Sequence, residues 1–234
     1  MPTSERARPS QPQPPTPSPS PTQGQPSTLP HAKPFLVWFA VLAAFGVLFQ
    51  WWWLVVPMVL LGAYVLYFFR TPAPIPPDDP RAIVSPAHGV VTDVMETEEP
   101  NYLKGRARRI GIFLSVFDVH VQAAPTDSTL RWTDYRPGKF LDARDCNCSG
   151  MNECQWLGFE SKQGFHYTVK LIAGLIARRI VLWRPKNAQV ARGDLISLIR
   201  FGSRVEIFLP PDAEITVKVG ERVKGGETIV ARKS

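Results

Sequence analysis

Apolar and polar residues alternate along the stretch from Leu195 to Pro210. This period of two is typical of a β-strand that buries one face, because successive side chains of a strand point to opposite sides. The pattern is broken at Gly202 and Ser203, and it resumes at Arg204. A glycine inside a strand pattern usually marks a bulge or a close approach of two backbones. The pattern therefore predicts two half-buried strands that meet at a Gly-Ser step.

Short apolar or alternating runs, separated by glycine and proline, continue through residues 81–234. Runs of this length and spacing predict a barrel or sandwich of short strands, a mainly β fold. The segment from Asp142 to Gly158 has no clear period, and we expect a loop there with at most one helical turn. The expected strands are Ile83–Val84, Val90–Val94, Arg109–Val116, Val119–Val121, Tyr167–Ala173, Arg179–Trp183, Leu195–Phe201, Arg204–Leu209, Ile215–Val219 and Thr228–Ala231.

From Phe35 to Phe69 the chain is almost wholly apolar, and Gln50 is its only strongly polar residue. A single helix of this length would measure about 52 Å, well beyond a hydrocarbon core of about 30 Å. Division at Gln50 gives segments of 15 and 19 residues, with Trp51 and two further tryptophans at the tip. We therefore predict a membrane helical hairpin over residues 35–70, either spanning or re-entrant. The alternative is a buried hairpin of a soluble protein.

Basic residues flank this predicted hairpin, with Lys33 and Arg70 at its ends and none at its tip. The positive-inside tendency then puts both ends, and the chain that follows, in the cytoplasm. Residues 1–34 hold eleven prolines and few apolar side chains, so we expect a disordered tail. Residues 71–80 are also rich in proline and are predicted to form a stiff linker, which leaves residues 81–234 as the β-rich domain.

Composition excludes several other classes of protein. The net charge is +7, but the basic residues are scattered among apolar strand residues without a recognised binding motif. This favours an anionic lipid surface over nucleic acid as the partner. Cys146, Cys148 and Cys154 are the only cysteines, and an odd number in one short segment argues against a disulfide framework. A fourth ligand is missing nearby, so we predict no metal site.

The Gly202-Ser203 step places an unhindered carbonyl directly before a hydroxyl. A serine Oγ in this position can attack the preceding carbonyl if a base takes its proton and donors hold the oxyanion. Asp118 and His120, two residues apart, would project to the same face of a strand, where the carboxylate could fix the imidazole as a general base. Each feature also has a plain structural alternative: a turn for the first and a surface ion pair for the second.

Four segments together resemble the short, type II form of bacterial phosphatidylserine decarboxylase, a group that includes archaetidylserine decarboxylases. The resemblance extends over roughly Phe35 to Ala231 and includes the apolar hairpin. The four segments, in chain order, are SVFDVHV (115–121), YRPGKF (135–140), IAGLIARRI (172–180) and IRFGSRVEIFLP (199–210).

The resemblance implies a proenzyme that cuts itself between Gly202 and Ser203. An ester replaces the peptide bond, elimination releases the upstream chain, and Ser203 becomes a pyruvoyl group on a fragment of 32 residues. The pyruvoyl group would accept electrons during decarboxylation of phosphatidylserine to phosphatidylethanolamine, as pyridoxal does elsewhere. The resemblance also implies that His120 is the acid or base of the reaction. Asp118 and His88 are further catalytic candidates beside it.

The resemblance further implies a phospholipid substrate, and the predicted hairpin with its basic flanks puts the chain on the cytoplasmic side of the cell inner membrane. The two fragments would stay together as a heterodimer, alone or in a larger oligomer. Basic side chains near the motifs would meet the phosphate and carboxylate of the headgroup, or form a solvated basic face on anionic lipid. The candidates are Arg204, Arg200, Arg179 and Lys139.

The chain departs from the family pattern at two places. His88 stands where the family usually has aspartate, and a histidine cannot supply the same negative charge to an imidazolium. Gln122 and Ala123 stand where Asn-Arg is common, so an arginine that could recognise the headgroup is missing.

Two alternatives follow from these features. One is an uncleaved, inactive homologue of the decarboxylase. The other is a membrane-anchored adaptor, since Val217 to Lys233 resembles the closing hairpin of a lipoyl-type barrel-sandwich hybrid.

Overall fold

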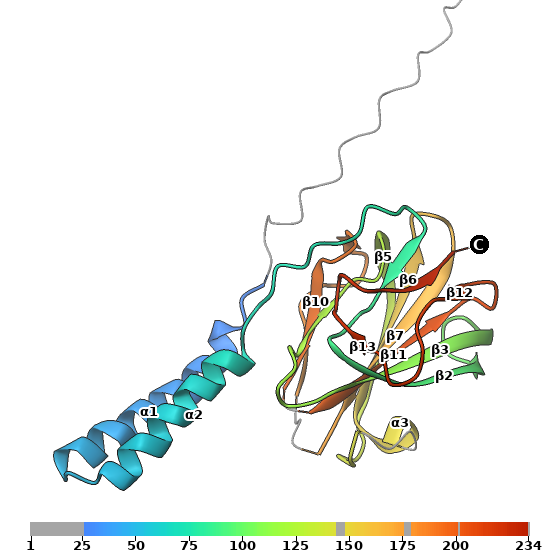
Figure 1. Ribbon diagram of the computed structural model, residues 1–234. Helices are drawn as coiled ribbons and strands as arrows, with labels where there is room; N and C mark the ends of the chain where they lie inside the picture. Colours follow the sequence, from blue (N-terminus) through green and yellow to red (C-terminus); the bar gives the residue numbers. More distant parts are fainter. Residues whose placement is uncertain (1–25, 144–147, 176–178, 201, 234) are drawn as a thin grey trace, which may run out of the picture.

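The computed structural model describes residues 26–143, 148–175, 179–200 and 202–233. A pair of long helices projects from one side of a β-rich domain (Figure 1). The helices are α1 (Leu29–Leu48) and α2 (Trp52–Phe68), with a short α3 (Cys148–Met151) in the β-rich domain. The strands are β1 (Ala82–Val84), β2 (Gly89–Glu99), β3 (Gly105–Leu114), β4 (Val121–Ala123), β5 (Ser128–Arg136), β6 (Cys154–Ser161), β7 (His166–Ala173), β8 (Ile180–Leu182), β9 (Gln189–Val190), β10 (Leu195–Ile199), β11 (Ser203–Leu209), β12 (Glu214–Ile215), β13 (Arg222–Val223) and β14 (Ile229–Arg232).

The strands form one large curled sheet and two small ones. The large sheet has the order β13-β2-β3-β11-β7-β6-β5-β9, and the small sheets are β1-β14-β12 and β4-β10-β8. All the strand pairs are antiparallel. One hydrophobic core, which includes Ile110, Leu157, Val205 and Ile207, fills the space inside the curl. The predicted fold class, mainly β with an N-terminal apolar helical hairpin, is confirmed.

Strand β11 lies inside the large sheet, between β3 and β7. The alternation of its residues predicts one face in the core and one in solvent, but all seven residues are buried. The polar positions Arg204 and Glu206 face other charged groups inside the protein instead of water. The prediction of a half-buried strand was therefore wrong, because a period of two cannot distinguish solvent from a buried ionic layer.

The predicted loop from Asp142 to Gly158 was also wrong in its last part, since β6 begins at Cys154. Gly158 lies within this strand, where a Cβ would overlap the ring of Tyr102. Gly158 thus allows the ring of Tyr102 to approach the main chain closely, and it does not end the strand. Strand β5 was missed altogether, because its exposed edge carries charged residues that hide its apolar positions.

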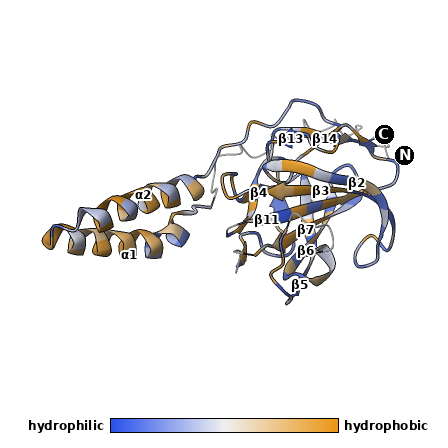
Figure 2. Cartoon of the chain, turned by 60° about the horizontal axis from the view of Figure 1, so that its bottom comes forward, coloured by the Kyte–Doolittle hydropathy of each residue, from blue (hydrophilic) through white to orange (hydrophobic). Residues whose placement is uncertain are grey.

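The two helices pack against each other, and apolar residues cover most of their surface (Figure 2). Helix α1 begins at Leu29, six residues before the apolar run, because the proline at its start is compatible with a first helical turn. Its 20 residues are long and apolar enough to cross a membrane, with a mean hydropathy of 1.6, whereas α2 has 17. The boundary between helices falls at Gln50, as predicted.

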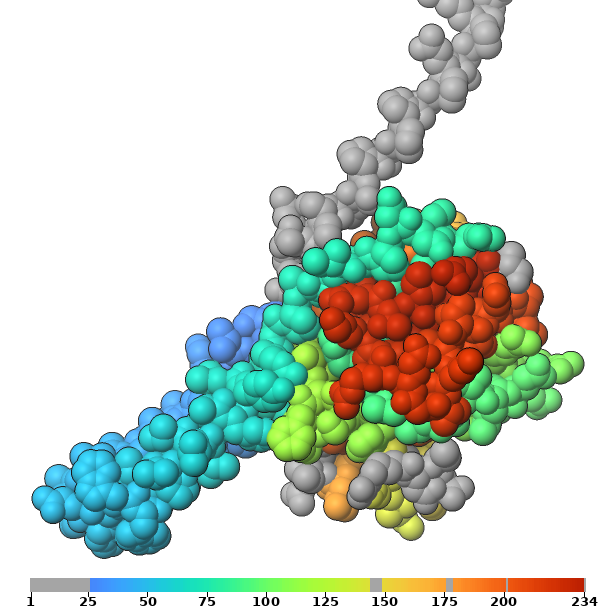
Figure 3. Space-filling view, viewed as in Figure 1, coloured from blue at the N-terminus to red at the C-terminus, as the bar shows by residue number. Residues whose placement is uncertain are grey.

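The base of the hairpin is packed onto the β-rich domain. Phe68 and Phe69 at the end of α2 share a buried cluster with Val121 of β4 and Leu198 of β10. The hydroxyls of Tyr64 and Tyr67 donate to the main-chain carbonyls of Val116 and Phe117, at 3.1 and 3.2 Å. In Figure 3 the turn after β3, in yellow-green, lies directly against the hairpin. The segment that carries the candidate histidine is therefore attached to the helices.

Candidate active site

Gly202 and Ser203 lie where β11 begins. Gly202 has a φ of 61°, in the left-handed region that favours glycine. Ser203 is fully buried, and its hydroxyl makes no hydrogen bond to any residue that the structure describes. Buried hydroxyls are normally paired, so an unpaired one beside a left-handed glycine is an unusual feature. The arrangement leaves the lone pairs of Ser203 Oγ available for chemistry.

His120 contacts the same peptide segment directly. Its Nε2 accepts a hydrogen bond from the Gly202 N–H at 3.1 Å, and its Nδ1 lies 2.9 Å from the main-chain oxygen of Asp118. A ring nitrogen that accepts carries no proton, so Nδ1 carries the proton and donates it. Burial, partly opposed by Asp118, lowers the pKa of His120 to about 4. The imidazole is therefore neutral at physiological pH and can take up a proton.

Asp118 supports His120 through its main chain. Both residues precede β4, in a turn, so the predicted arrangement on one face of a strand was wrong. The carboxylate of Asp118 accepts hydrogen bonds from Ser115 N–H at 2.9 Å and from Arg222 at 2.7 Å. Burial would raise its pKa, but these bonds hold the pKa below its usual range. Asp118 remains an anion and fixes the turn in which His120 lies.

His88 lies in the connection between β1 and β2, half-buried beside Gly225. Burial lowers its pKa, and the charges of Asp118 and Arg70 act on it as they act on His120. Glu227 and Lys224 also act on His88 but not on His120, and no hydrogen bond joins the two imidazoles among the described residues. At neutral pH His88 provides no charge to the site.

Arg204 is the largest fully buried side chain, although its guanidinium is charged. It forms ion pairs with Asp93 of β2 and with Glu206, and it donates to Thr92 Oγ1 at 2.7 Å. Burial would lower its pKa, but Glu206 and Asp93 raise it above the ordinary value. Arg109 joins the same acidic groups, at 3.0 Å from Asp93. Arg204 thus has internal partners and is not exposed to a ligand from solvent.

The other basic candidates are distributed differently. Arg200 and Arg179 lie together, since the Arg200 N–H donates to the Arg179 carbonyl at 3.2 Å. Burial and the charge of Arg179 lower the pKa of Arg200, whose side chain also contacts His31 of α1 at 2.9 Å. Lys139 is exposed, in a segment that pairs with Asn152. The structure therefore brings two of the four basic candidates together, at the base of the hairpin.

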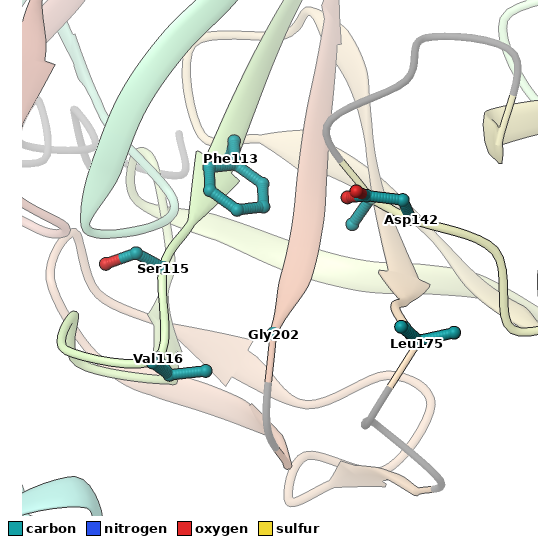
Figure 4. Close-up of a pocket in the computed structure, with 7 residues that line it drawn as sticks. Phe113, Ser115, Val116, Asp142, Leu175 and Gly202 are labelled. Carbon is teal, nitrogen blue, oxygen red and sulfur yellow. The ribbon is translucent and has the colours of Figure 1, made fainter.

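A pocket of about 310 Å³ opens beside Gly202. Figure 4 shows Val116 and Leu175 on either side of Gly202, with Phe113 and Asp142 above them in the view; all five residues line the pocket. Leu175 is 68% exposed and lies at the rim, so the entrance is apolar. Pockets of this kind, mostly apolar with a few polar groups, are usual binding sites for small molecules and lipids.

Two residues in the site were missed as functional candidates. Gln122, noted only as a departure from the family pattern, is buried and donates to the His120 carbonyl at 2.7 Å. Gly174, which directly follows β7, donates its N–H to the Gly202 carbonyl at 3.1 Å. Gly174 lies within one of the four motifs, but main-chain donors leave no chemical signal in a sequence. Cys146 lies outside the described residues, and Cys154 is a buried free thiol.

Known proteins match this chain over most of its length. The family model for phosphatidylserine decarboxylase matches residues 61–231. The phosphatidylserine decarboxylase proenzyme of Symbiobacterium thermophilum is 43% identical over 198 residues, 84% of this chain and 90% of the relative. The proenzymes of Carboxydothermus hydrogenoformans and Zymomonas mobilis are 43% and 37% identical, over 85% and 88% of this chain and 92% and 87% of their own lengths.

The family model covers the β-rich domain up to residue 231, including His120 and the Gly202-Ser203 step. They confirm the resemblance based on the four motifs and favour an enzyme over the adaptor. The chain therefore belongs to the phosphatidylserine decarboxylase family.

Proposed function

We propose that the chain cuts itself between Gly202 and Ser203 and then decarboxylates phosphatidylserine with the pyruvoyl group that Ser203 becomes. Decarboxylation by a processed proenzyme is the activity of the family to which the chain belongs. One observation carries the assignment of the cleavage site. The neutral, buried imidazole of His120 accepts a hydrogen bond from the Gly202 N–H. The next residue, Ser203, has a buried hydroxyl without a hydrogen-bond partner among the described residues.

The residues around position 203 fit a pyruvoyl group. The group replaces a side chain that makes no hydrogen bond to described residues, so its formation breaks no side-chain hydrogen bond among them. The adjacent main chain is held by pairing of position 203 with Leu114 of β3 and Ala173 of β7. When formed, the pyruvoyl ketone supplies an electron sink for loss of CO2. His120 would hold or deliver the proton that replaces the carboxylate, since its neutral Nε2 faces this segment.

The substrate headgroup would bind at the pocket beside Gly202. Arg200 and Arg179 are the basic candidates for its phosphate, at the base of the hairpin, and exposed Lys139 is a third. Arg204 was the fourth candidate, but its ion pairs with Asp93 and Glu206 give it a structural role. The apolar rim at Leu175 suits the glycerol and acyl part of a phospholipid.

The two fragments would remain one folded unit after cleavage. Residues 203–233 supply β11, which pairs on both sides with strands of the upstream fragment, β3 and β7. Strands β13 and β14 of the same fragment pair with β2 and β1. A heterodimer of the fragments, alone or in a larger oligomer, is therefore the expected mature form.

The helical hairpin would anchor the enzyme on the cytoplasmic side of the inner membrane. The length and apolar surface of α1 support this anchoring, as do Lys33 and Arg70 at the two ends of the hairpin. The carbonyl of Phe117 accepts a hydrogen bond from the Tyr67 hydroxyl at the base of the hairpin. The side chain of Phe117 is 66% exposed beside it. A membrane there would place the pocket entrance near the lipid surface.

Intact-mass measurement of the full chain, purified in detergent, tests this proposal. We expect two fragments that separate after Gly202, with the 32-residue fragment lacking ammonia relative to serine at its first position. Ser203→Ala should stay whole, whereas Ser128→Ala, which alters another buried serine, should still be cut. A wild-type chain that folds, stays whole and retains an ordinary serine would overturn the proposal.

A further inference from the structure

We propose that the main-chain N–H of Gly174 is the oxyanion donor for self-cleavage, and that position 174 is glycine because the scissile carbonyl lies against it. This inference rests on the proposed cleavage between Gly202 and Ser203. It assigns a catalytic contact to a residue from a different motif, IAGLIARRI, at the end of β7.

The geometry comes from two contacts on one residue. The Gly202 carbonyl accepts from the Gly174 N–H at 3.1 Å, and the Gly202 N–H donates to His120 Nε2 at 3.1 Å. Both polar groups of the residue that would be attacked are thus held by groups from separate elements. Holding a carbonyl at a preset donor is the arrangement that stabilises a developing oxyanion.

Space explains why position 174 is a glycine. A Cβ built on Gly174 would overlap the carbonyl oxygen of Gly202 and would lie 3.2 Å from Ala143 Cβ. Any larger residue would push the scissile carbonyl away from its donor. Gly174 is buried, so the main chain has little room to move aside.

In the first step, Ser203 Oγ bonds to the Gly202 carbonyl carbon, and the hydroxyl proton passes to a base. The carbonyl oxygen becomes an oxyanion, which the Gly174 N–H stabilises. The bond from that carbon to the Ser203 nitrogen then breaks, and the nitrogen takes a proton, which leaves an ester. Loss of the Ser203 Cα proton breaks the Cβ–Oγ bond and releases the Gly202 carboxylate. Water then replaces the nitrogen, which leaves as ammonia, and the ketone remains. The Gly174 contact acts only before the ester forms.

The alternative is that this bond only extends the pairing of β7 with β11. Ala173 pairs with Ser203, so Gly174 opposite Gly202 continues the same register. A purely structural bond would affect folding and stability but not the rate of ester formation in a folded chain. The test therefore has to separate the first chemical step from folding.

The first experiment follows cleavage of the full-length chain made by cell-free synthesis with lipid nanodiscs. We expect Gly174→Ala to slow cleavage by about 100-fold or more, the effect of losing one oxyanion donor. Hydroxylamine cuts esters and would release the fragments wherever an ester has accumulated before elimination. It should release no fragment from Gly174→Ala, because the ester does not form in this variant. Gly150→Ala is the matched control, since a Cβ there meets no atom within 4 Å. Thermal unfolding confirms that each variant is folded.

The second experiment removes the donor without adding an atom that overlaps. Glycolic acid incorporated at position 174 replaces the N–H with an ester oxygen, and the same change at Gly105, an exposed strand end, is the control. We again expect a loss of about 100-fold at position 174 only. Cleavage of either folded 174 variant within about threefold of wild type, or accumulation of ester, would overturn this inference. If wild type itself is not cut, the proposed function fails instead.

Discussion

Ser203 and Arg204 are neighbours on β11, and both are buried, but their side chains lie on opposite faces of the strand and differ in their polar partners. The Ser203 hydroxyl shares its face with Val205 and Ile207 and has no partner among the described residues. The Arg204 guanidinium, on the other face, contacts Asp93, Glu206 and Thr92. Leaving a buried hydroxyl unpaired costs about 1–3 kcal/mol, so the Ser203 face is less favourable for stability than the Arg204 face.

The contrast indicates that one face of β11 contributes stability and the other face contributes the reactive group. The ionic face holds β11 in place through partners on two strands: Arg204 pairs with Asp93 of β2, and Glu206 lies 3.7 Å from Arg109 of β3. The other face leaves the nucleophile free to react. Because the proposed cut breaks the covalent link before Ser203, the ion pairs of Arg204 would add to the pairing with β3 and β7 in keeping the new end of the strand in position.

The largest expected effect comes from breaking the ionic face. Arg204→Met should lower the free energy of unfolding by about 3–5 kcal/mol, because it leaves Asp93 and Glu206 buried without their main counter-charge. Urea unfolding in detergent, with Ser203→Ala added to keep the chain whole, measures this. Arg131→Met, in a pair that is 47% and 41% exposed, should cost less than about 1 kcal/mol. Equal losses from the two variants would contradict the role given to Arg204.

The next effect tests the reactive face through the pH dependence of cleavage. His120 can act as a base only when neutral, and burial lowers its pKa to about 4. The rate should therefore stay nearly constant from about pH 8 down to about pH 5 and fall to half near the pKa, not near the ordinary value of 6.5. Single-turnover cleavage of freshly synthesised chain measures this. A rate that already halves at the ordinary pKa would show that the base is a different or more exposed group.

The smallest expected effect concerns His88→Asp, the change that restores the usual family residue. We expect the cleavage rate to change by less than about threefold, because the Asp118 carbonyl already fixes the tautomer of His120 and its carboxylate already acts on the ring. His166→Asp, outside the site, serves as the control in the same assay. A rise of tenfold or more would mean that the histidine at position 88 limits cleavage.

Much of the fold was accessible from local patterns. The apolar run divided at Gln50 predicted the two helices, and alternating residues predicted β11 and much of β3. Strand β5 was not predicted because Arg131 and Arg136 occupy exposed positions in it, and β6 was not predicted because Gly158 resembles a loop residue. Local patterns fail where a third element, such as Tyr102 over Gly158, decides what a position requires.

The candidate site was predictable only in part. Ser203 and His120 could be selected from the sequence as candidate catalytic residues because their side chains have distinctive chemistry. The structure brings His120 against Gly202. The partner of His120 Nδ1 is a main-chain carbonyl, and the partner of the Gly202 carbonyl is a main-chain N–H. Every residue carries such groups, so no pattern of residue types could identify these two donors and acceptors.

Composition and periodicity were enough to predict an apolar hairpin, a β-rich domain and a serine after a flexible glycine, because both depend only on neighbours along the chain. The fold makes Arg204 an internal ion-pair residue, and it brings Gly174, 28 positions upstream, to a place where its N–H donates to the Gly202 carbonyl. Those outcomes depend on which strands pair and on what lies across each face, and these are properties of the folded chain as a whole.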